Sequence, residues 1–169
     1  TGVDLSSGLG ATTITKLDAS GLTGTVAAAS GLTYTSDTLA ASSIIKGSAS
    51  ATNTIDINAA TTASTFVTYT GGSGNDVIAS TNNNNNVFNL GNGTNSINNG
   101  AAAGNGNNTV TGGTGADTIK LGNGNNTINA DAGANVIVVG NGNNTITTGT
   151  GAQTITLGIN DYGSTDITS

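Results

Sequence analysis

The sequence of 169 residues is notable first for the residue types it lacks: cysteine, proline, methionine, tryptophan and histidine. Without cysteine the chain has no disulfide bond and no thiolate metal site. It also lacks glutamate and arginine, so His, Cys, Glu and Arg are all missing as catalytic base, nucleophile or anion clamp. We therefore expect no enzymatic activity. The absence of proline suits strands in which every backbone N–H must join a ladder of hydrogen bonds.

Charged and aromatic residues are scarce, at 7% and 3% of the chain. The chain has three lysines and nine aspartates, which give a net charge of −6, so we expect no basic surface for nucleic acid. No apolar run is long enough to insert into a membrane, and no signal peptide is visible. The chain begins with Thr1 rather than Met, so we expect a fragment or a mature segment of a longer protein. A hydrophobic content of 34% predicts a thin, stacked core rather than a thick one.

What the chain has in abundance is a repeat. Residues 112–156 divide into five nonapeptides, which read GGTGADTIK, LGNGNNTIN, ADAGANVIV, VGNGNNTIT and TGTGAQTIT. The sixth position is Asp, Asn or Gln, and the eighth is always Ile. With one-residue and four-residue insertions at Ser80 and at 99–102, the frame extends upstream to Gly71 and gives nine units. Such a fixed period is the mark of a stacked array, because one unit cannot bury its apolar face alone.

Each unit joins a turn to a short strand. The first six residues are rich in Gly and Asn, which accept the backbone conformations of tight turns. The last three place one large apolar residue between two outward ones, the pattern of a minimal strand. Two units then make one coil of a parallel β-solenoid, with equivalent residues stacked 18 apart plus insertions, at about 4.8 Å.

This interpretation predicts the walls of the core. One wall should stack Ile78, Ile97, Ile119, Ile137 and Ile155, and the other Phe88, Val110, Ile128 and Ile146. Residues two positions further on should also face inward, large on the first wall (Leu121, Val139, Leu157) and small on the second (Gly112, Ala130, Thr148). Large side chains opposite small ones would fill a thin core.

The rest of the chain has a looser rhythm. Residues 1–70 are rich in Ser, Thr and Ala, and short alternating runs such as LTGTV (22–26) and SIIK (43–46) predict short strands. We favour irregular coils of the same solenoid over a separate sandwich, because these strands are too short and polar to build two packed sheets. We expect two regions, 1–70 and 71–169, with Ile167 closing an atypical last coil. Asp18 and Asp56 are expected in turns.

Two stretches carry a family resemblance. Residues 71–78 (GGSGNDVI) and 112–119 (GGTGADTI) match the pattern G-G-x-G-x-D-x-U of RTX calcium-binding repeats. The chain from Gly71 onward thus resembles the right-handed β-roll of proteins exported by bacterial type I secretion. Residues 14–24 (ITKLDASGLTG) resemble segments of RTX-type bacterial surface-layer proteins. This resemblance implies a secreted structural protein on the outer surface of the cell, which assembles with copies of itself.

The resemblance also implies calcium between the turns of neighbouring coils, held by sixth-position carboxylates and turn carbonyls. The candidate ligands are Asp117 with Asn135, helped by Asp131, and then Asp76 with Asn95. The other stack, Asn86, Asn108, Asn126 and Asn144, has no carboxylate, although calcium usually takes several charged oxygens. The alternative is that stacked amides, which both donate and accept hydrogen bonds, have replaced the metal.

Two other functions share this fold. Outward threonines such as Thr109, Thr127 and Thr145 could order water, as in RTX-like ice-binding modules, although we expect insertions and Lys120 to interrupt that face. An adhesin stalk is the other alternative.

Overall fold

The computed structural model of the chain describes residues 2–5, 14–22, 30–35, 42–57, 66–81, 83–100, 105–158 and 164–169. All the regular secondary structure in these residues is β-strand. No helix among them is long and apolar enough to cross a membrane.

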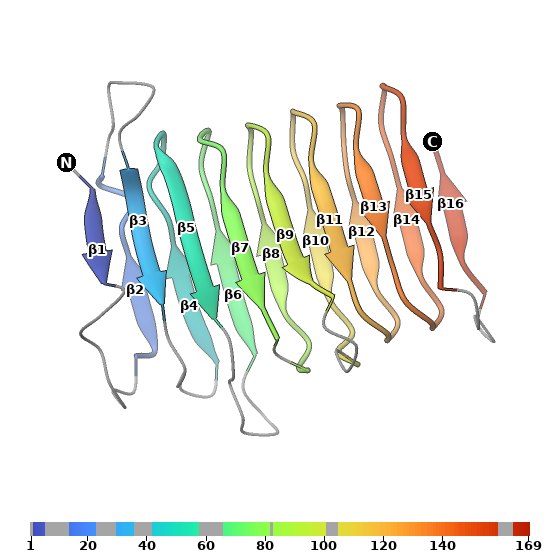
Figure 1. Ribbon diagram of the computed structural model, residues 1–169, viewed down its shortest axis with the longest axis horizontal. Coiled ribbons are helices and arrows are strands. Elements are labelled where there is room, and N and C mark those ends of the chain that lie inside the picture. Colours follow the sequence, from blue (N-terminus) through green and yellow to red (C-terminus); the bar gives the residue numbers. More distant parts are fainter. Residues whose placement is uncertain are drawn as a thin grey trace.

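The strands of the described residues form two parallel sheets of eight strands each. The odd sheet contains β1 (Val3–Leu5), β3 (Ser30–Thr35), β5 (Thr52–Ile57), β7 (Val77–Ser80), β9 (Ser96–Asn99), β11 (Thr118–Leu121), β13 (Val136–Val138) and β15 (Thr154–Thr156). The even sheet contains β2 (Lys16–Asp18), β4 (Ser43–Lys46), β6 (Val67–Thr70), β8 (Val87–Asn89), β10 (Thr109–Thr111), β12 (Thr127–Asn129), β14 (Thr145–Thr147) and β16 (Asp166–Thr168). Because the chain enters the two sheets alternately, it winds as an elongated solenoid (Figure 1).

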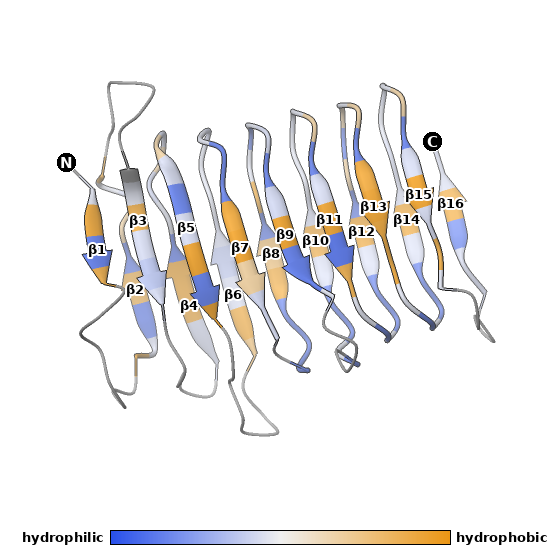
Figure 2. Ribbon diagram, viewed as in Figure 1, coloured by the Kyte–Doolittle hydropathy of each residue, from blue (hydrophilic) through white to orange (hydrophobic). Residues whose placement is uncertain are grey.

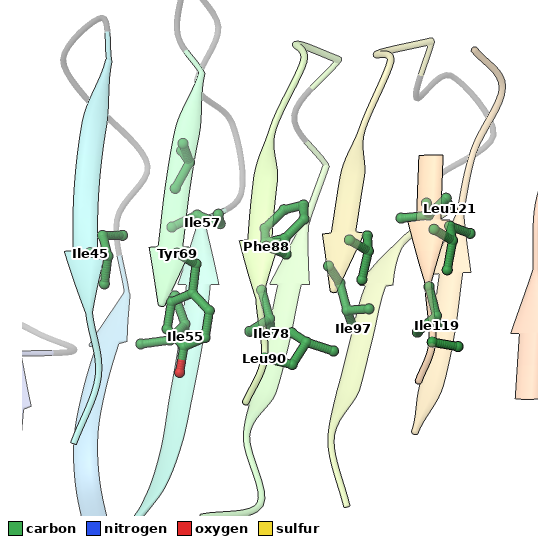
Figure 3. Packing of buried hydrophobic residues seen from close by; sticks show 14 of the residues in the cluster. Ile45, Ile55, Ile57, Tyr69, Ile78, Phe88, Leu90, Ile97, Ile119 and Leu121 are labelled. Carbon is green, nitrogen blue, oxygen red and sulfur yellow. The ribbon is translucent and has the colours of Figure 1, made fainter. Parts of the chain in front are cut away.

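The core is the thin layer between the two sheets, and its walls are those expected from the repeat. On the odd sheet Ile119 pairs with Ile97 on one side and with Ile137 on the other, and on the even sheet Ile128 pairs with Val110 and Ile146. All of these side chains belong to one buried core cluster. Figure 3 shows Ile97 and Ile119 of the odd sheet and Phe88 of the even sheet in the space between the sheets, and hydrophobic residues lie near the middle of many strands (Figure 2). The parallel β-solenoid is therefore confirmed.

Most of the alternate inward positions are also as predicted. Leu121, Val139 and Ala130 are buried, and so are Gly112 and Thr148. Leu157 is the exception, because 37% of it is exposed. It follows β15, which pairs only with β13 in the described residues, so no further strand covers that part of the wall.

The two insertions do not lie where the sequence frame puts them. Ser80 is the last residue of β7 and Asn99 the last of β9, and both are buried. Both side chains occupy the inward position that Leu121 fills in a later coil, since Asn99 pairs with Leu121. Ser80 and Asn99 therefore belong to their strands and not to the insertions, because a strand that slipped by one residue would reverse its two faces.

Residues 1–70 supply β1–β6, which belong to the same two sheets. Across the boundary at residue 70, β5 pairs with β7 and β6 pairs with β8. The register between β3 and β5 shifts between Ser30 and Thr33, which accounts for the looser sequence rhythm there. Asp56 lies in strand β5 rather than in a turn, and most of the run at 22–26 is outside the described residues.

Glycine at the fourth repeat position permits the coils to approach closely. Gly115 and Gly133 have φ values of 135° and 137°, which side chains with a Cβ rarely adopt. A Cβ at Gly133 would lie 1.7 Å from the carbonyl oxygen of Gly115 in the preceding coil. The turns therefore stack backbone on backbone, and this spacing positions the polar side chains described next.

Candidate functional site

The candidate site consists of two columns of polar side chains, one at each edge of the solenoid where the chain passes between the sheets, and all of them except Gln153 are buried. The aspartate edge, where the chain passes from the even to the odd sheet, lies at the top of Figure 1. It carries Asn53, Asp76, Asn95, Asp117, Asn135 and Gln153. The amide edge, where the chain passes back, lies at the bottom of the same view and carries Asn86, Asn108, Asn126 and Asn144.

On both edges the side-chain oxygen ties one coil to the previous one. The backbone N–H of Asn95 donates to Asp117 Oδ1 at 2.9 Å, and that of Asp117 donates to Asn135 Oδ1 at 2.9 Å. On the amide edge the N–H of Asn108 donates to Asn126 Oδ1 at 3.1 Å. The sixth position therefore accepts the same hydrogen bond in every one of these coils, whether it is a carboxylate or an amide.

The second polar atom of the side chain distinguishes Asn from Asp. Asn95 Nδ2 donates to the carbonyl oxygens of Gly91 and Gly93 in its own turn, at 3.2 and 3.3 Å. An aspartate oxygen cannot donate unless it is protonated. Each Asp on the aspartate edge thus needs another partner for the oxygen that takes the place of this nitrogen.

At Asp76 protein groups supply that partner. Asn53 donates to Oδ1 from its backbone N–H at 2.9 Å and from Nδ2 at 2.7 Å, and the Tyr69 hydroxyl donates to Oδ2 at 2.8 Å. Burial raises the pKa of Asp76, and these hydrogen bonds oppose the shift. Since neither oxygen is left unpaired, the Asp76 turn does not fit a cation.

Asp117 is different, because its Oδ2 is buried and has no hydrogen-bond partner. Among the described residues the only other buried side-chain N or O atom in this state is the Tyr34 hydroxyl. Val110 stands where Tyr69 stands in the Asp76 coil, two residues before the turn, and has no hydroxyl to offer. A Cβ at Gly112 would lie 2.7 Å from Oδ2, so this glycine keeps the space beside the carboxylate open.

The electrostatics of Asp117 agree with this geometry. Burial raises the pKa of its carboxyl group, hydrogen bonds from Asn95 oppose the shift, and the nearby negative charge of Asp131 adds to it. A cation beside Oδ2 would relieve both the burial penalty and the repulsion from Asp131. The unpaired oxygen of Asp117 is therefore compatible with a bound cation, whereas both oxygens of Asp76 already have partners. The calcium ligands themselves stay a prediction.

The other predicted ligands lie close to these carboxylates in the stack. Asn135 Oδ1 already accepts the Asp117 N–H, and its Nδ2 donates to the carbonyl oxygens of Ala130 and Gly133. Asn95 Oδ1 accepts the Asp76 N–H at 2.9 Å. Asp131 is half-buried with a φ of 52°. The described residues contain no group of three or more acidic, His or Cys side chains that could hold a metal.

Sequence reasoning missed Tyr69 and Asn53. A signal for Asn53 is present, because Asn53-Thr54-Ile55 repeats the Asn-Thr-Ile of the regular units, and this side chain continues the aspartate edge upstream of Gly71. No local signal identifies Tyr69 as a donor to Asp76, since it lies in the core column between Ile45 and Phe88.

The outer face of the even sheet is more regular than the sequence suggests. Thr109, Thr127 and Thr145 pair in register and face outward. Thr111, Asn129 and Thr147 form a second column beside them. Lys120, Ser80 and Asn99 all lie in strands of the odd sheet, so none of these residues interrupts the columns.

Residues 14–22 of the segment that was compared with surface-layer proteins comprise β2 and the start of the connection after it, and residues 23 and 24 lie outside the described residues. Asp18 Oδ1 accepts hydrogen bonds from the N–H and hydroxyl of Ser20, at 3.2 and 2.6 Å, and Ala19 is buried against the core. Its local role is to close a coil.

Comparison with known proteins agrees with this geometry. Residues 102–137 and 130–161 match the family model described as the RTX calcium-binding nonapeptide repeat (4 copies). The matched region includes Asp117, Asp131 and Asn135 but not Asp76 or Asn95. No curated protein and no solved structure matches the chain. The chain thus contains an RTX-repeat β-roll, a module typical of secreted bacterial proteins.

Proposed function

We propose that this chain is a non-catalytic structural module of a secreted bacterial surface layer, in which it assembles with copies of itself. In this proposal type I secretion delivers it to the outer cell surface, where calcium bound at Asp117 stiffens the solenoid. The observation that carries the proposal is the pair of continuous parallel sheets, which make an elongated body from repeated coils (Figure 1). The resemblance of residues 14–24 to surface-layer segments points the same way.

The placement of the charged groups supports a structural rather than a catalytic role. Asp76 and Asp117 are buried in separate turns of one edge, and the Oδ1 atom of each accepts a backbone N–H of the previous coil. Lys16 and Lys46 both lie within 4 Å of Asp18, at 3.9 and 3.7 Å. We infer no nucleic-acid partner, since such pairing leaves little free positive charge.

Calcium at Asp117 would act on the one unpaired carboxylate oxygen of the aspartate edge. Asp117 would be the charged ligand, Asp131 would add negative charge, and turn carbonyl oxygens would complete the oxygen shell that calcium prefers. Binding to the folded state alone would raise its stability by mass action.

Calorimetric titration of the purified chain with calcium tests this site. We expect binding to the native chain and none to Asp117→Asn, while Asp166→Asn, which removes an exposed charge on β16, leaves binding unchanged. Undiminished binding by Asp117→Asn would remove Asp117 from the proposal.

Electron microscopy of the full-length secreted protein tests assembly separately. Ordered two-dimensional arrays support the surface layer. Isolated thin stalks would instead identify an adhesin-like protein and contradict the proposal, whatever the calorimetry shows.

A second candidate function, the ordering of water at an ice surface, is favoured by the outward column of Thr109, Thr127 and Thr145 on the even sheet. Thermal hysteresis of the purified chain measures it. If this function holds, Thr127→Lys abolishes the hysteresis, while Thr118→Lys, on the outer face of the odd sheet, preserves it. Absence of hysteresis in the native chain rules this candidate out.

A further inference from the structure

The turns of the amide edge direct backbone carbonyl oxygens at one point in each coil, and a positively polarised group must lie among them. In the turn before β12, the carbonyl oxygens of Gly122 and Gly124 accept hydrogen bonds from Asn126 Nδ2 at 3.3 and 3.1 Å. Asn144 makes the same two bonds in its own turn at the same distances. The carboxamide N–H groups therefore occupy the centre of an oxygen-lined turn.

The same nitrogen reaches the neighbouring coil. Asn126 Nδ2 donates to Asn144 Oδ1 at 3.0 Å, and Asn108 Nδ2 donates to Asn126 Oδ1 at 3.2 Å. Asn86 Nδ2 donates in turn to Asn108 Oδ1 at 3.1 Å. The NH₂ groups of Asn86, Asn108 and Asn126 thus bridge oxygens of two successive turns, which is the structural role that a cation between the turns would have.

We propose that these carboxamides hold the coils of the amide edge together in place of a cation, so that this edge folds without calcium and binds none. Calcium takes six to eight oxygens, usually including carboxylates, whereas the oxygens here are neutral and already paired with N–H groups. Asn126 and Asn144 are each 1% exposed. Water therefore cannot reach the turn oxygens to help replace their N–H partners by calcium. This inference depends neither on surface-layer assembly nor on calcium at Asp117.

A second ladder with the opposite direction strengthens the amide edge. Here the oxygen accepts from the following coil rather than the previous one: the N–H of Asn125 donates to Asn107 Oδ1 at 2.7 Å, and that of Asn143 donates to Asn125 Oδ1 at 2.9 Å. The sixth-position ladder runs the other way, since the N–H of Asn126 donates to Asn144 Oδ1. In the turns of this edge, the coil of Asn125 and Asn126 is therefore tied to both neighbours by hydrogen bonds between amides.

Hydrogen exchange of the native chain in a calcium chelator gives the first test. The backbone amides of Asn108 and Asn126, which donate to the next coil, should exchange as slowly in EGTA as in calcium. The amide of Asn95, which donates to Asp117 on the other edge, is the internal comparison. Amides of the amide edge that lose protection in EGTA and regain it with calcium would overturn the proposal.

Exchanging the residue types between the edges gives the second test. Asn126→Asp replaces the donor Nδ2 by an oxygen that faces the oxygens of Gly122, Gly124 and Asn144. That oxygen would be left without a hydrogen-bond partner, as Asp117 Oδ2 is in the native chain. We expect Tm in EGTA to fall by about 5–10 °C, since a buried group without a partner costs a few kcal/mol. Asp117→Asn should raise Tm in EGTA by about 2–5 °C, because it supplies the missing donor.

The two variants together keep the test decisive. If Asn126→Asp does not fold, the amides of Asn108 and Asn126 in folded Asp117→Asn still show whether the amide edge is closed in EGTA. An Asn126→Asp variant with unchanged Tm in EGTA would mean that the amide nitrogen is not needed, and it would overturn the proposal.

Discussion

The two edges of the solenoid use the same backbone turn but fill it differently. On the amide edge the sixth-position residue is Asn in each of the four regular coils, and every buried amide atom there has a hydrogen-bond partner. On the aspartate edge Asp, Asn and Gln share the column, and Asp117 keeps one oxygen unpaired. The comparison teaches that the same turn can hold either an amide N–H group or an unpaired carboxylate oxygen at its centre, and that a single atom makes the difference.

On the aspartate edge, the residue type at the first repeat position depends on the residue type at the sixth. Gly71 precedes Asp76 and Gly112 precedes Asp117, whereas Leu90 precedes Asn95. A Cβ at Gly71 or Gly112 would lie 2.1 or 2.7 Å from the carboxylate Oδ2, so a larger residue is compatible with the amide but not with this carboxylate position. In the Asp76 coil the Tyr69 hydroxyl also contacts Oδ2, and in the Asp117 coil the oxygen has no such neighbour.

The largest loss of stability is expected at the stacked glycines, because both edges depend on their close approach. Gly133→Ala on the aspartate edge should lower the free energy of unfolding by about 3–5 kcal/mol, from backbone strain at positive φ and from contact with the Gly115 carbonyl. Gly142→Ala on the amide edge should cost about 2–4 kcal/mol, because its closest approach is 2.4 Å rather than 1.7 Å. Urea unfolding measures both. Gly21→Ala is the control, since a Cβ there meets nothing within 4 Å, and equal losses in all three variants would contradict the explanation.

The next effect concerns the hydroxyl that distinguishes Asp76 from Asp117. Tyr69→Phe should destabilise the chain by about 1–3 kcal/mol, because it leaves Asp76 Oδ2 buried without its donor. Tyr34→Phe is the matched control: the Tyr34 hydroxyl is buried without a partner, so its removal should be neutral or stabilising. Urea unfolding at constant pH compares the two, and similar losses would show that the Tyr69 hydroxyl bond contributes little.

The pH dependence of stability in a chelator should separate the edges further. Burial raises the folded-state pKa of Asp76 and of Asp117 above the ordinary value of 3.8. Between that value and the raised pKa these two groups bind more protons in the folded state than in the unfolded state. Their contribution to stability is therefore greatest below pH 3.8 and is lost as pH rises through the folded pKa. Asp117→Asn should make this fall shallower, as followed by urea unfolding at a series of pH values in EGTA. A rise in stability over the same range would contradict the burial argument.

The smallest effect is expected at the exposed ladder of the amide edge. Asn125→Ala removes only the acceptor for the Asn143 N–H and should cost about 0.5 kcal/mol, since water can replace it. The adjacent Asn126→Ala should cost about 2–3 kcal/mol, because it leaves buried carbonyl and N–H groups unpaired. Thermal unfolding of the two variants measures the difference. Equal costs would mean that burial does not set the strength of these ladders.

Much of the fold could be predicted because equivalent residues recur in successive repeats and must therefore have equivalent positions in successive coils. A spacing of one coil separates Ile119 from Ile137 on one wall and Ile128 from Ile146 on the other. This spacing located both inner walls, since residues one coil apart must stack in parallel sheets. The positions of the insertions could not be predicted, because sliding Ser80 into the turn or the strand leaves the spacing of the large apolar residues unchanged. Leu157 was misplaced for a related reason: its repeat position predicts an inward side chain, but burial also needs a covering neighbour.

The candidate site could be predicted in part. The sixth-position column and the difference between its two edges follow from the positions of Asp and Asn in the repeat. That Asp76 is satisfied and Asp117 is not depends on Tyr69, which lies seven residues before Asp76 and enters from the even sheet. No sequence period connects a core tyrosine with a turn aspartate.

The sequence by itself determined the coil, the inner walls and the two polar columns, because period, side-chain size and turn propensity are local properties that repeat along the chain. The tertiary structure decided which buried oxygen has a partner. That depends on which atoms of adjacent coils and of the opposite sheet meet within hydrogen-bond distance, and such meetings are set by the packing of the whole solenoid rather than by any single repeat.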